Sequence, residues 1–193
     1  MHPTSADQQG EQGSAASTDH DLMYVTVDIF IMRLQRKASQ VQILLVKRRK
    51  DPGQGMWAIP GGFVKIDESL EAAARRELGE ETHLEGLPML QLQAFGDPGR
   101  DPRYRVVSIA YFAFLYGDAQ AQADDDAAEV GWFSLREVPH LAFDHNDLLA
   151  QVIDHLGARL VDTATALNIL PGSFNLSEVR CIVDALLKAQ QAN

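Results

Sequence analysis

The feature that most constrains this chain is a stretch in which two glycines are followed by a glutamate-rich helix. The stretch reads GFVKIDESLEAAARRELGEETHL and runs from Gly62 to Leu84. Ser69 is a suitable N-cap, and the alanines after it are strong helix formers, so a helix is predicted from Ser69 to about His83. On that helix Glu77, Glu80 and Glu81 lie at positions i, i+3 and i+4, which places them on one face.

Three like charges at these spacings repel one another. They also lie near the C-terminal end of the predicted helix, where the helix dipole favours cations. A bound divalent cation would remove both costs, because carboxylate oxygens are the protein ligands that Mg²⁺ prefers. A solvated acidic face on an exposed helix would give the same spacing. The nearby Gly61-Gly62 pair, Arg76 and Glu68 favour a functional site over a solvated face.

The stretch resembles the signature of the Nudix hydrolase family, G-x5-E-x7-R-E-U-x-E-E-x-G-U, in which U is an aliphatic residue. Eight of its nine specified positions match, namely Gly62, Glu68, Arg76, Glu77, Leu78, Glu80, Glu81 and Leu84. The ninth position is His83, where the family has glycine. Glycine suits a left-handed helix end, and histidine in that conformation costs about 1 kcal/mol. We interpret His83 as a tolerated substitution at the helix end and not as a metal ligand.

The resemblance implies a nucleoside diphosphate linked to another moiety as the substrate, hydrolysed with Mg²⁺ or Mn²⁺. It also implies a set of carboxylates that ligate the metal and take part in catalysis: Glu77, Glu80 and Glu81. Arg76 would orient a carboxylate through a charge-assisted hydrogen bond, and Glu68 would support the joint between loop and helix. The general base stays open between one of these glutamates and an acid of the loop from Asp124 to Glu129, such as Glu129.

The sequences that flank the signature resemble the branch of the family that hydrolyses ADP-ribose, and a related group of transcription regulators of NAD metabolism. Together with the signature they cover about residues 22–150. Guanidinium groups near a Pro/Gly loop suit the binding of a phosphate or a ribose. The candidate substrate-binding residues are Arg48, Arg103 and Arg105, with Gly61 and Gly62 where the loop passes close to the substrate. Arg100 belongs to the same cluster. Trp57 or Tyr104 could stack on adenine, but for both residues an ordinary structural role, core packing in the case of Trp57, is the favoured interpretation.

Runs of β-branched and aromatic residues predict strands at 22–34, 41–49, 89–95 and 105–117, with a short extended piece at 57–64. Further helices are predicted at 145–160 and 176–190, the second from a stripe of apolar residues that requires a partner. Interleaved strands and helices indicate the α/β class. The resemblance implies an α/β/α sandwich around a mixed β-sheet, with an extra C-terminal helical segment.

Three regions are expected along the chain. Residues 1–21 contain no Lys or Arg and few apolar residues, so a disordered tail is predicted there. A Nudix domain would occupy residues 22–145. A helical extension would occupy 146–193 as a possible remnant of a winged-helix domain, and its last helix would pack on the domain or across a dimer.

Charge and composition exclude several classes of protein. The chain has 17 Lys and Arg against 27 Asp and Glu, a net charge of −10, which disfavours a sequence-independent hold on nucleic acid. No run approaches the roughly 18 apolar residues that a membrane span needs. The single cysteine, Cys181, fits a reducing compartment. From composition we expect a cytoplasmic protein that binds neither DNA nor membranes. The resemblance implies a homodimeric enzyme that acts on a small nucleotide.

The main alternative is a regulator that senses ADP-ribose. The segment from Phe174 to Lys188 resembles the first helix of the winged-helix domain in such regulators. Against this reading, the sequence leaves no room for a recognition helix, and residues 146–193 carry three basic and five acidic residues. A second alternative, the removal of unusual nucleoside triphosphates, shares the signature but not the flanking resemblance. The sequence therefore favours hydrolysis of ADP-ribose to AMP and ribose 5-phosphate.

Overall fold

The computed structural model describes residues 22–35, 40–115, 127–160 and 176–190. The tail predicted at residues 1–21 lies outside the described residues, as do Asp124, Asp125 and Asp126 of the predicted acidic loop.

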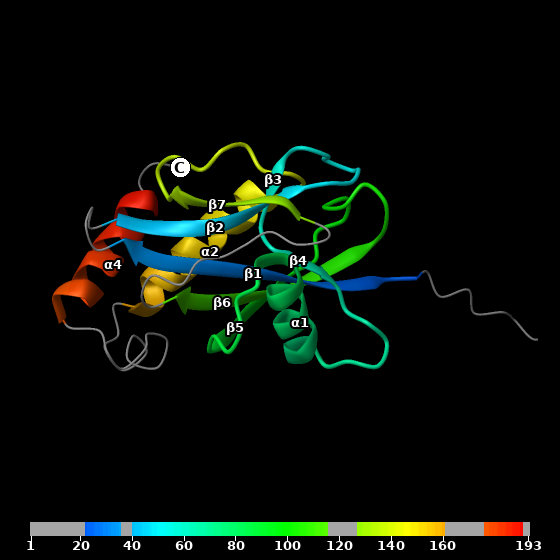
Figure 1. Ribbon diagram of the computed structural model, residues 1–193, viewed down its shortest axis with the longest axis horizontal. Coiled ribbons are helices and arrows are strands. Elements are labelled where there is room, and N and C mark those ends of the chain that lie inside the picture. Colours follow the sequence, from blue (N-terminus) through cyan, green and yellow to red (C-terminus); the bar gives the residue numbers. More distant parts are fainter. Residues whose placement is uncertain (1–21, 36–39, 116–126, 161–175, 191–193) are drawn as a thin grey trace, which may run out of the picture.

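The strands of the described residues form one seven-stranded mixed sheet (Figure 1). They are β1 (Tyr24–Gln35), β2 (Gln40–Arg48), β3 (Trp57–Ala58), β4 (Gly61–Phe63), β5 (Met89–Phe95), β6 (Val106–Leu115) and β7 (Ala127–Ser134). The order is β3-β2-β1-β6-β5, with β4 paired to β1 and β7 paired to β2. β1 and β6 run parallel, and the other pairs are antiparallel. The mixed sheet that was predicted is confirmed.

The two long strands β1 and β2 diverge, and this divergence positions the functional site. They pair only between Met32–Gln35 and Gln40–Ile43. Further along, β1 pairs with β4 and β2 pairs with β3, so the segment 57–63 fills the gap between them. A side chain at Gly61 would collide with the carbonyl oxygen of Val27 on β1, which is why only glycine fits at this close approach.

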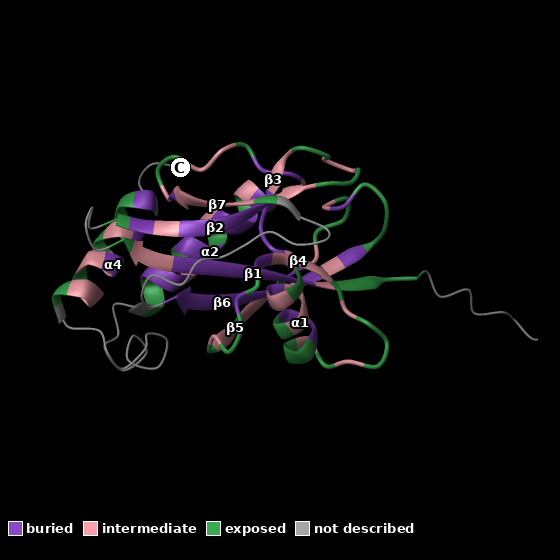
Figure 2. Ribbon diagram, in the orientation of Figure 1, coloured by how far each residue is buried: buried purple, intermediate pink, exposed green. Residues whose placement is uncertain are grey.

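Among the described residues, three helices cover the two faces of the sheet: α1 (Leu70–Thr82), α2 (His145–Leu160) and α4 (Leu176–Gln190). The middle of β1 is buried (Figure 2). Its residues alternate between two hydrophobic cores. Ile29 and Ile31 share a core with Leu78 of α1. Phe30 and Met32 belong to the core that contains the apolar residues of α2 and α4. The layers are therefore helix, sheet and helix, which confirms the predicted α/β/α sandwich.

The last helix packs on its own domain. Ile182 and Leu186 of α4 are fully buried in the core that α2 and the sheet share. Of the two packing modes expected for this helix, the structure therefore shows the first. Helix α2, which lies beyond the domain boundary expected at residue 145, also contributes to this core through Val152 and Leu156. None of the helices in the described ranges is both long and apolar enough to cross a membrane.

Both predicted ends of α1 are confirmed. The hydroxyl of Ser69 accepts a hydrogen bond from the backbone N–H of Ala72 at 3.1 Å. At the other end His83 adopts the left-handed conformation, with φ 55° and ψ 18°, and its N–H donates to the carbonyl of Gly79. The prediction of a loop up to Glu129 is wrong, because this residue lies in β7 opposite Lys47 of β2.

Candidate active site

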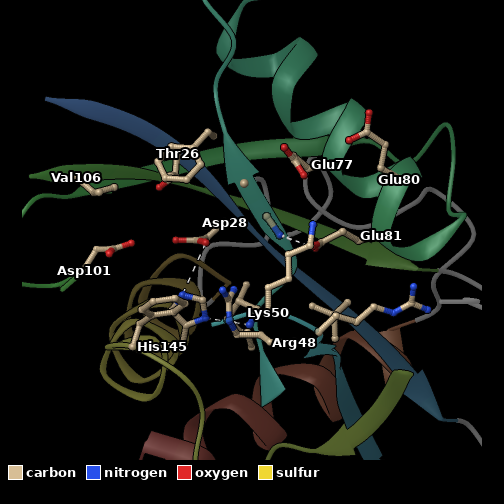
Figure 3. A pocket seen from close by; sticks show the side chains of 18 of the residues that line it. Thr26, Asp28, Arg48, Lys50, Glu77, Glu80, Glu81, Asp101, Val106 and His145 are labelled. Atoms are coloured by element: carbon tan, nitrogen blue, oxygen red, sulfur yellow. Dashed lines mark hydrogen bonds and ion pairs between the residues drawn. The ribbon is translucent and has the colours of Figure 1, made fainter. Parts of the chain in front are cut away.

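A pocket opens where β1 and β2 diverge (Figure 3). Glu77, Glu80 and Glu81 of α1 line one side of it, and the glycine pair of β4 lines the adjoining wall. The end of β2 and the start of the following loop add basic residues to the lining, Arg48, Arg49 and Lys50. The structure therefore brings the predicted acids, glycines and Arg48 together in one cavity.

Arg76 is the centre of the acidic side of the pocket. Its guanidinium donates to both carboxylate oxygens of Glu68, at 2.6 and 3.0 Å. It also donates to Glu77 at 2.6 Å, to Glu80 at 3.0 Å and to the carbonyl of Phe63 at 3.0 Å. These hydrogen bonds lower the pKa of Glu68 to about 2 and raise the pKa of Arg76. Arg76 thus links the loop before α1 to the acidic face of that helix.

Gly62 fits closely against Glu77. A Cβ atom at Gly62 would overlap the Glu77 carboxylate, so the absence of a side chain leaves space for this acid. Burial is the largest influence on Glu77 and raises its pKa, although the hydrogen bond from Arg76 opposes this.

Glu81 is the most deeply buried of the three acids. It accepts a hydrogen bond from the backbone N–H of Gly61 at 2.9 Å. Burial raises its pKa to about 8, helped by the nearby charges of Glu77 and Asp28. A cation bound beside this carboxyl group would stabilise its charged form.

The three glutamates do not form a converged metal cage on their own. Among the described residues, no group of three or more His, Cys, Asp or Glu side chains lies close enough together to hold a metal ion as it stands. The reason is local, because Arg76 binds Glu77 and Glu80 while the backbone of Gly61 binds Glu81. The set of donors nevertheless suits a hard divalent cation, since all three are carboxylates that line one pocket.

Two of the three predicted substrate-binding arginines line the pocket. Arg48 donates from Nε to the carbonyl of Pro52, and its guanidinium lies 4.6 Å from the ring centre of Phe143. Arg103 is paired through two nitrogens with Asp101 and lies 5.5 to 5.7 Å from the rings of Phe63 and Phe143. Both guanidinium planes are therefore held beside aromatic rings at the wall of the cavity.

Other candidates lie elsewhere. Arg105 is exposed, is not among the residues that line the pocket, and donates to the carbonyl of Val106. Glu129 forms an exposed ion pair with Lys47 at 3.2 Å and does not line the pocket either. Trp57 packs edge-on against Phe133, 4.8 Å between ring centres, which identifies it as a packing residue. Tyr104 lies outside the pocket lining and packs against Tyr24, with the two rings tilted by 44°.

The sequence reasoning missed a buried polar cluster on the pocket floor. Asp28 of β1 and His145 of α2 both line the pocket and are each only 6% exposed. Arg100, which was expected to bind substrate from a loop, is buried in this cluster, where it pairs with Asp144 and Asp28. A charged residue inside the apolar run VTVDIFIM was the available signal for Asp28, because its alternation places it on a buried face.

Comparisons with known proteins agree on one domain type. The NUDIX domain model matches residues 24–156. The ADPR responsive transcriptional repressor NtrR of Acinetobacter baylyi is 34% identical over 174 residues, which are 88% of this chain and 69% of that protein. The ADP-ribose pyrophosphatase of Methanocaldococcus jannaschii is 42% identical over 108 residues, 56% of this chain and 63% of that protein. The chain thus spans about two thirds of the length of these two curated relatives.

A solved structure also resembles this fold. The cocrystal structure of the NUDIX domain of Shewanella oneidensis NrtR with ADP ribose is 32% identical, with a TM-score of 0.63. The match covers 71% of this chain and 90% of that one.

Proposed function

The chain belongs to the NUDIX family, whose domain model matches residues 24–156, and from this premise we propose that it is a pyrophosphohydrolase that cleaves ADP-ribose to AMP and ribose 5-phosphate. The observation that carries the proposal is the complete acid set of Glu77, Glu80 and Glu81, which lines one pocket with Arg76. The similarity to an ADP-ribose pyrophosphatase and to a NUDIX domain that binds ADP ribose supports the choice of substrate.

The residues suit a divalent cation, and we assign Mg²⁺ or Mn²⁺ to Glu77, Glu80 and Glu81. Such an ion, when bound, offsets the charge of the diphosphate and lowers the pKa of a water molecule. Arg76 holds Glu77 and Glu80 on the pocket side of α1, and the Gly61 N–H holds Glu81. The chain itself thus positions all three carboxylates before any ligand arrives.

The rest of the pocket suits the phosphates and the proton transfer. The guanidinium groups of Arg48 and Arg103, which line the same pocket, would bind phosphate oxygens. For the general base, the helix glutamates line the pocket whereas Glu129 does not, so a glutamate of α1 is the better candidate.

An ADP-ribose-responsive regulator is the second candidate. One observation favours it: the similarity to the repressor NtrR extends over 88% of this chain, whereas that to the pyrophosphatase covers 56%. The acidic balance of residues 146–193, three basic against five acidic residues, disfavours contact with DNA phosphates. The presence of every signature glutamate favours hydrolysis.

The test is a substrate panel with the wild-type chain. ADP-ribose, NADH, a diadenosine polyphosphate and the deoxynucleoside triphosphates are each incubated with Mg²⁺ or with EDTA, and products are separated by chromatography. We expect Mg²⁺-dependent release of AMP from ADP-ribose. Preference for a triphosphate would contradict the substrate assignment. No turnover at all, together with salt-sensitive binding to duplex DNA, would support the regulator. The homodimer implied by the resemblance is tested on the same sample by its mass in solution.

A further inference from the structure

The buried polar cluster on the pocket floor has no part in the reaction as proposed above. It consists of Asp28 on β1, Ser108 on β6, Arg100 and Asp144 in loops, and His145 at the start of α2. Burying such groups costs free energy unless hydrogen bonds compensate. The donors and acceptors that remain unused therefore indicate what the cluster can bind.

The proton of His145 has a defined position. The backbone N–H of Ile59 donates to Nδ1 of His145 at 3.0 Å, so Nδ1 acts as an acceptor. Burial lowers the pKa of His145, which favours the neutral ring. In a neutral imidazole with an accepting Nδ1, the proton lies on Nε2. Nε2–H is therefore a donor, and it lies 3.9 Å from Oδ1 of Asp28 (Figure 3).

The carboxylate of Asp28 is equally fixed. Its Oδ2 accepts from the hydroxyl of Ser108 and from Nη2 of Arg100. Arg100 in turn is held by two hydrogen bonds to Asp144, at 3.0 and 3.1 Å. The other oxygen, Oδ1, faces His145, and within the described part of the chain it accepts no hydrogen bond from a protein group.

A gap of 3.9 Å between a donor and an acceptor suits one kind of ligand atom. It is too long for a direct hydrogen bond. A hydroxyl oxygen about 2.8 Å from both atoms could donate to Oδ1 and accept from Nε2–H. A phosphate oxygen would be repelled by Asp28, and an ammonium group could not accept from His145.

We propose that Asp28 and His145 bind one sugar hydroxyl of the nucleotide substrate between Oδ1 and Nε2, and thereby select a ribose at this end of the pocket. The inference rests on the proposed function, because it assigns the floor of the same pocket to the substrate's sugar.

Two variants remove one partner each with little change of shape. In Asp28→Asn, the donors Ser108 and Arg100 require the amide oxygen at the Oδ2 position, so the NH₂ group faces the gap and opposes Nε2–H. In His145→Asn, the amide oxygen can still accept from Ile59 N–H, while the Nε2 donor is lost. Asp147→Asn, on the exposed surface of α2, is the control for the loss of one negative charge.

The experiment measures affinity by calorimetry with Mg²⁺ in a Glu80→Gln background that slows turnover. The ligands are ADP-ribose, analogues that lack one hydroxyl of the adenosine ribose, and analogues that lack one hydroxyl of the distal ribose. We expect one analogue to bind about 10- to 100-fold more weakly than ADP-ribose. Asp28→Asn and His145→Asn should each weaken the binding of ADP-ribose by a similar factor. Neither substitution should further weaken the binding of that analogue, because the hydroxyl it would affect is already missing. The position of the missing hydroxyl then identifies the sugar.

Other results separate the two proposals. If each variant weakens every ligand by the same factor, or if no analogue is weakened, the cluster has a structural role or holds only water, and the inference is overturned. The variants and the missing hydroxyl could show the expected non-additive effect on affinity while the wild-type chain does not hydrolyse ADP-ribose. That result would uphold the inference and overturn the proposed hydrolase activity. A wild type that binds no ADP-ribose would overturn both. Thermal unfolding of each variant shows whether it is folded.

Discussion

Arg76 donates from Nη1 to Oε1 of Glu77 over 2.6 Å, and this bond joins a largely buried guanidinium to a largely buried carboxylate. The same guanidinium donates two hydrogen bonds to the carboxylate of Glu68, which lies before the helix. Arg76 therefore offsets part of the negative charge on the acidic face of α1, and the remainder is available to a cation. This relationship explains how three clustered glutamates are tolerated at the end of a helix.

Arg76→Gln should destabilise the fold. Glu77 would lose its charged partner while its side chain remains mostly buried, with an exposure of 12%. We expect a loss of about 2–4 kcal/mol in the free energy of unfolding, measured by urea denaturation. Arg75→Gln is the matched control, because its pair with Glu71 is exposed and should be worth less than about 1 kcal/mol. An equal loss in the free energy of unfolding for both variants would contradict the claim that the ion pairs of Arg76 stabilise the fold.

Gly62→Ala should reduce hydrolysis more than it reduces stability. The added methyl group would overlap the Glu77 carboxylate and displace it from the pocket. We expect a fall of at least about tenfold in kcat/KM for ADP-ribose, since small displacements at an active site are costly. Gly79→Ala is the control on the adjacent helix, where an added methyl meets nothing within 4 Å. It should keep its activity and gain about 0.5–1 kcal/mol of stability.

The metal-free protein should lose stability as the pH rises. The pKa of Glu81 is 4.5 in the unfolded chain, and burial raises it to about 8 in the folded protein. Between these values the native state holds a proton that the unfolded chain lacks, so the free energy of unfolding falls from about pH 5 to pH 8 and then levels off. In Glu81→Gln this part of the fall, a few kcal/mol at most, should disappear from denaturation curves in EDTA. Identical pH profiles for wild type and variant would contradict the burial argument.

His83→Gly should stabilise the protein without changing its substrate. The histidine holds a left-handed conformation with φ 55°, which glycine adopts without steric cost. We expect a gain of about 0.5–1 kcal/mol in the free energy of unfolding. The ranking of substrates in the panel should stay the same. A new preferred substrate would show that the histidine contacts the ligand.

The features that depend on residues close together in the sequence could be predicted from it. The N-cap at Ser69, the left-handed end at His83 and the placement of three glutamates on one face of α1 depend on neighbours within a few residues. The alternation along β1 likewise follows from its residues, because each face meets a different hydrophobic core. These features could be predicted, and the structure has them.

Long-range packing decided the rest. Glu129 was expected in a loop near the catalytic acids, yet the register of β7 on β2 sets it opposite Lys47, 82 positions away in sequence. Arg100 and Arg105 looked equivalent to Arg103, but the tertiary fold buries the first and exposes the second. The Asp28–His145 gap is assembled from separate segments, so no local pattern could reveal it.

The most direct test of the account compares Glu80→Gln with Glu71→Gln in Mg²⁺-dependent hydrolysis of ADP-ribose. Both variants remove one carboxylate charge from α1, Glu80 inside the pocket lining and Glu71 in an exposed pair with Arg75. We expect kcat/KM to fall by about 100-fold or more in Glu80→Gln, because a metal ligand is lost, and to change less than about twofold in Glu71→Gln. Equal activity of the two variants would contradict the assignment of the catalytic acids to this face of the helix.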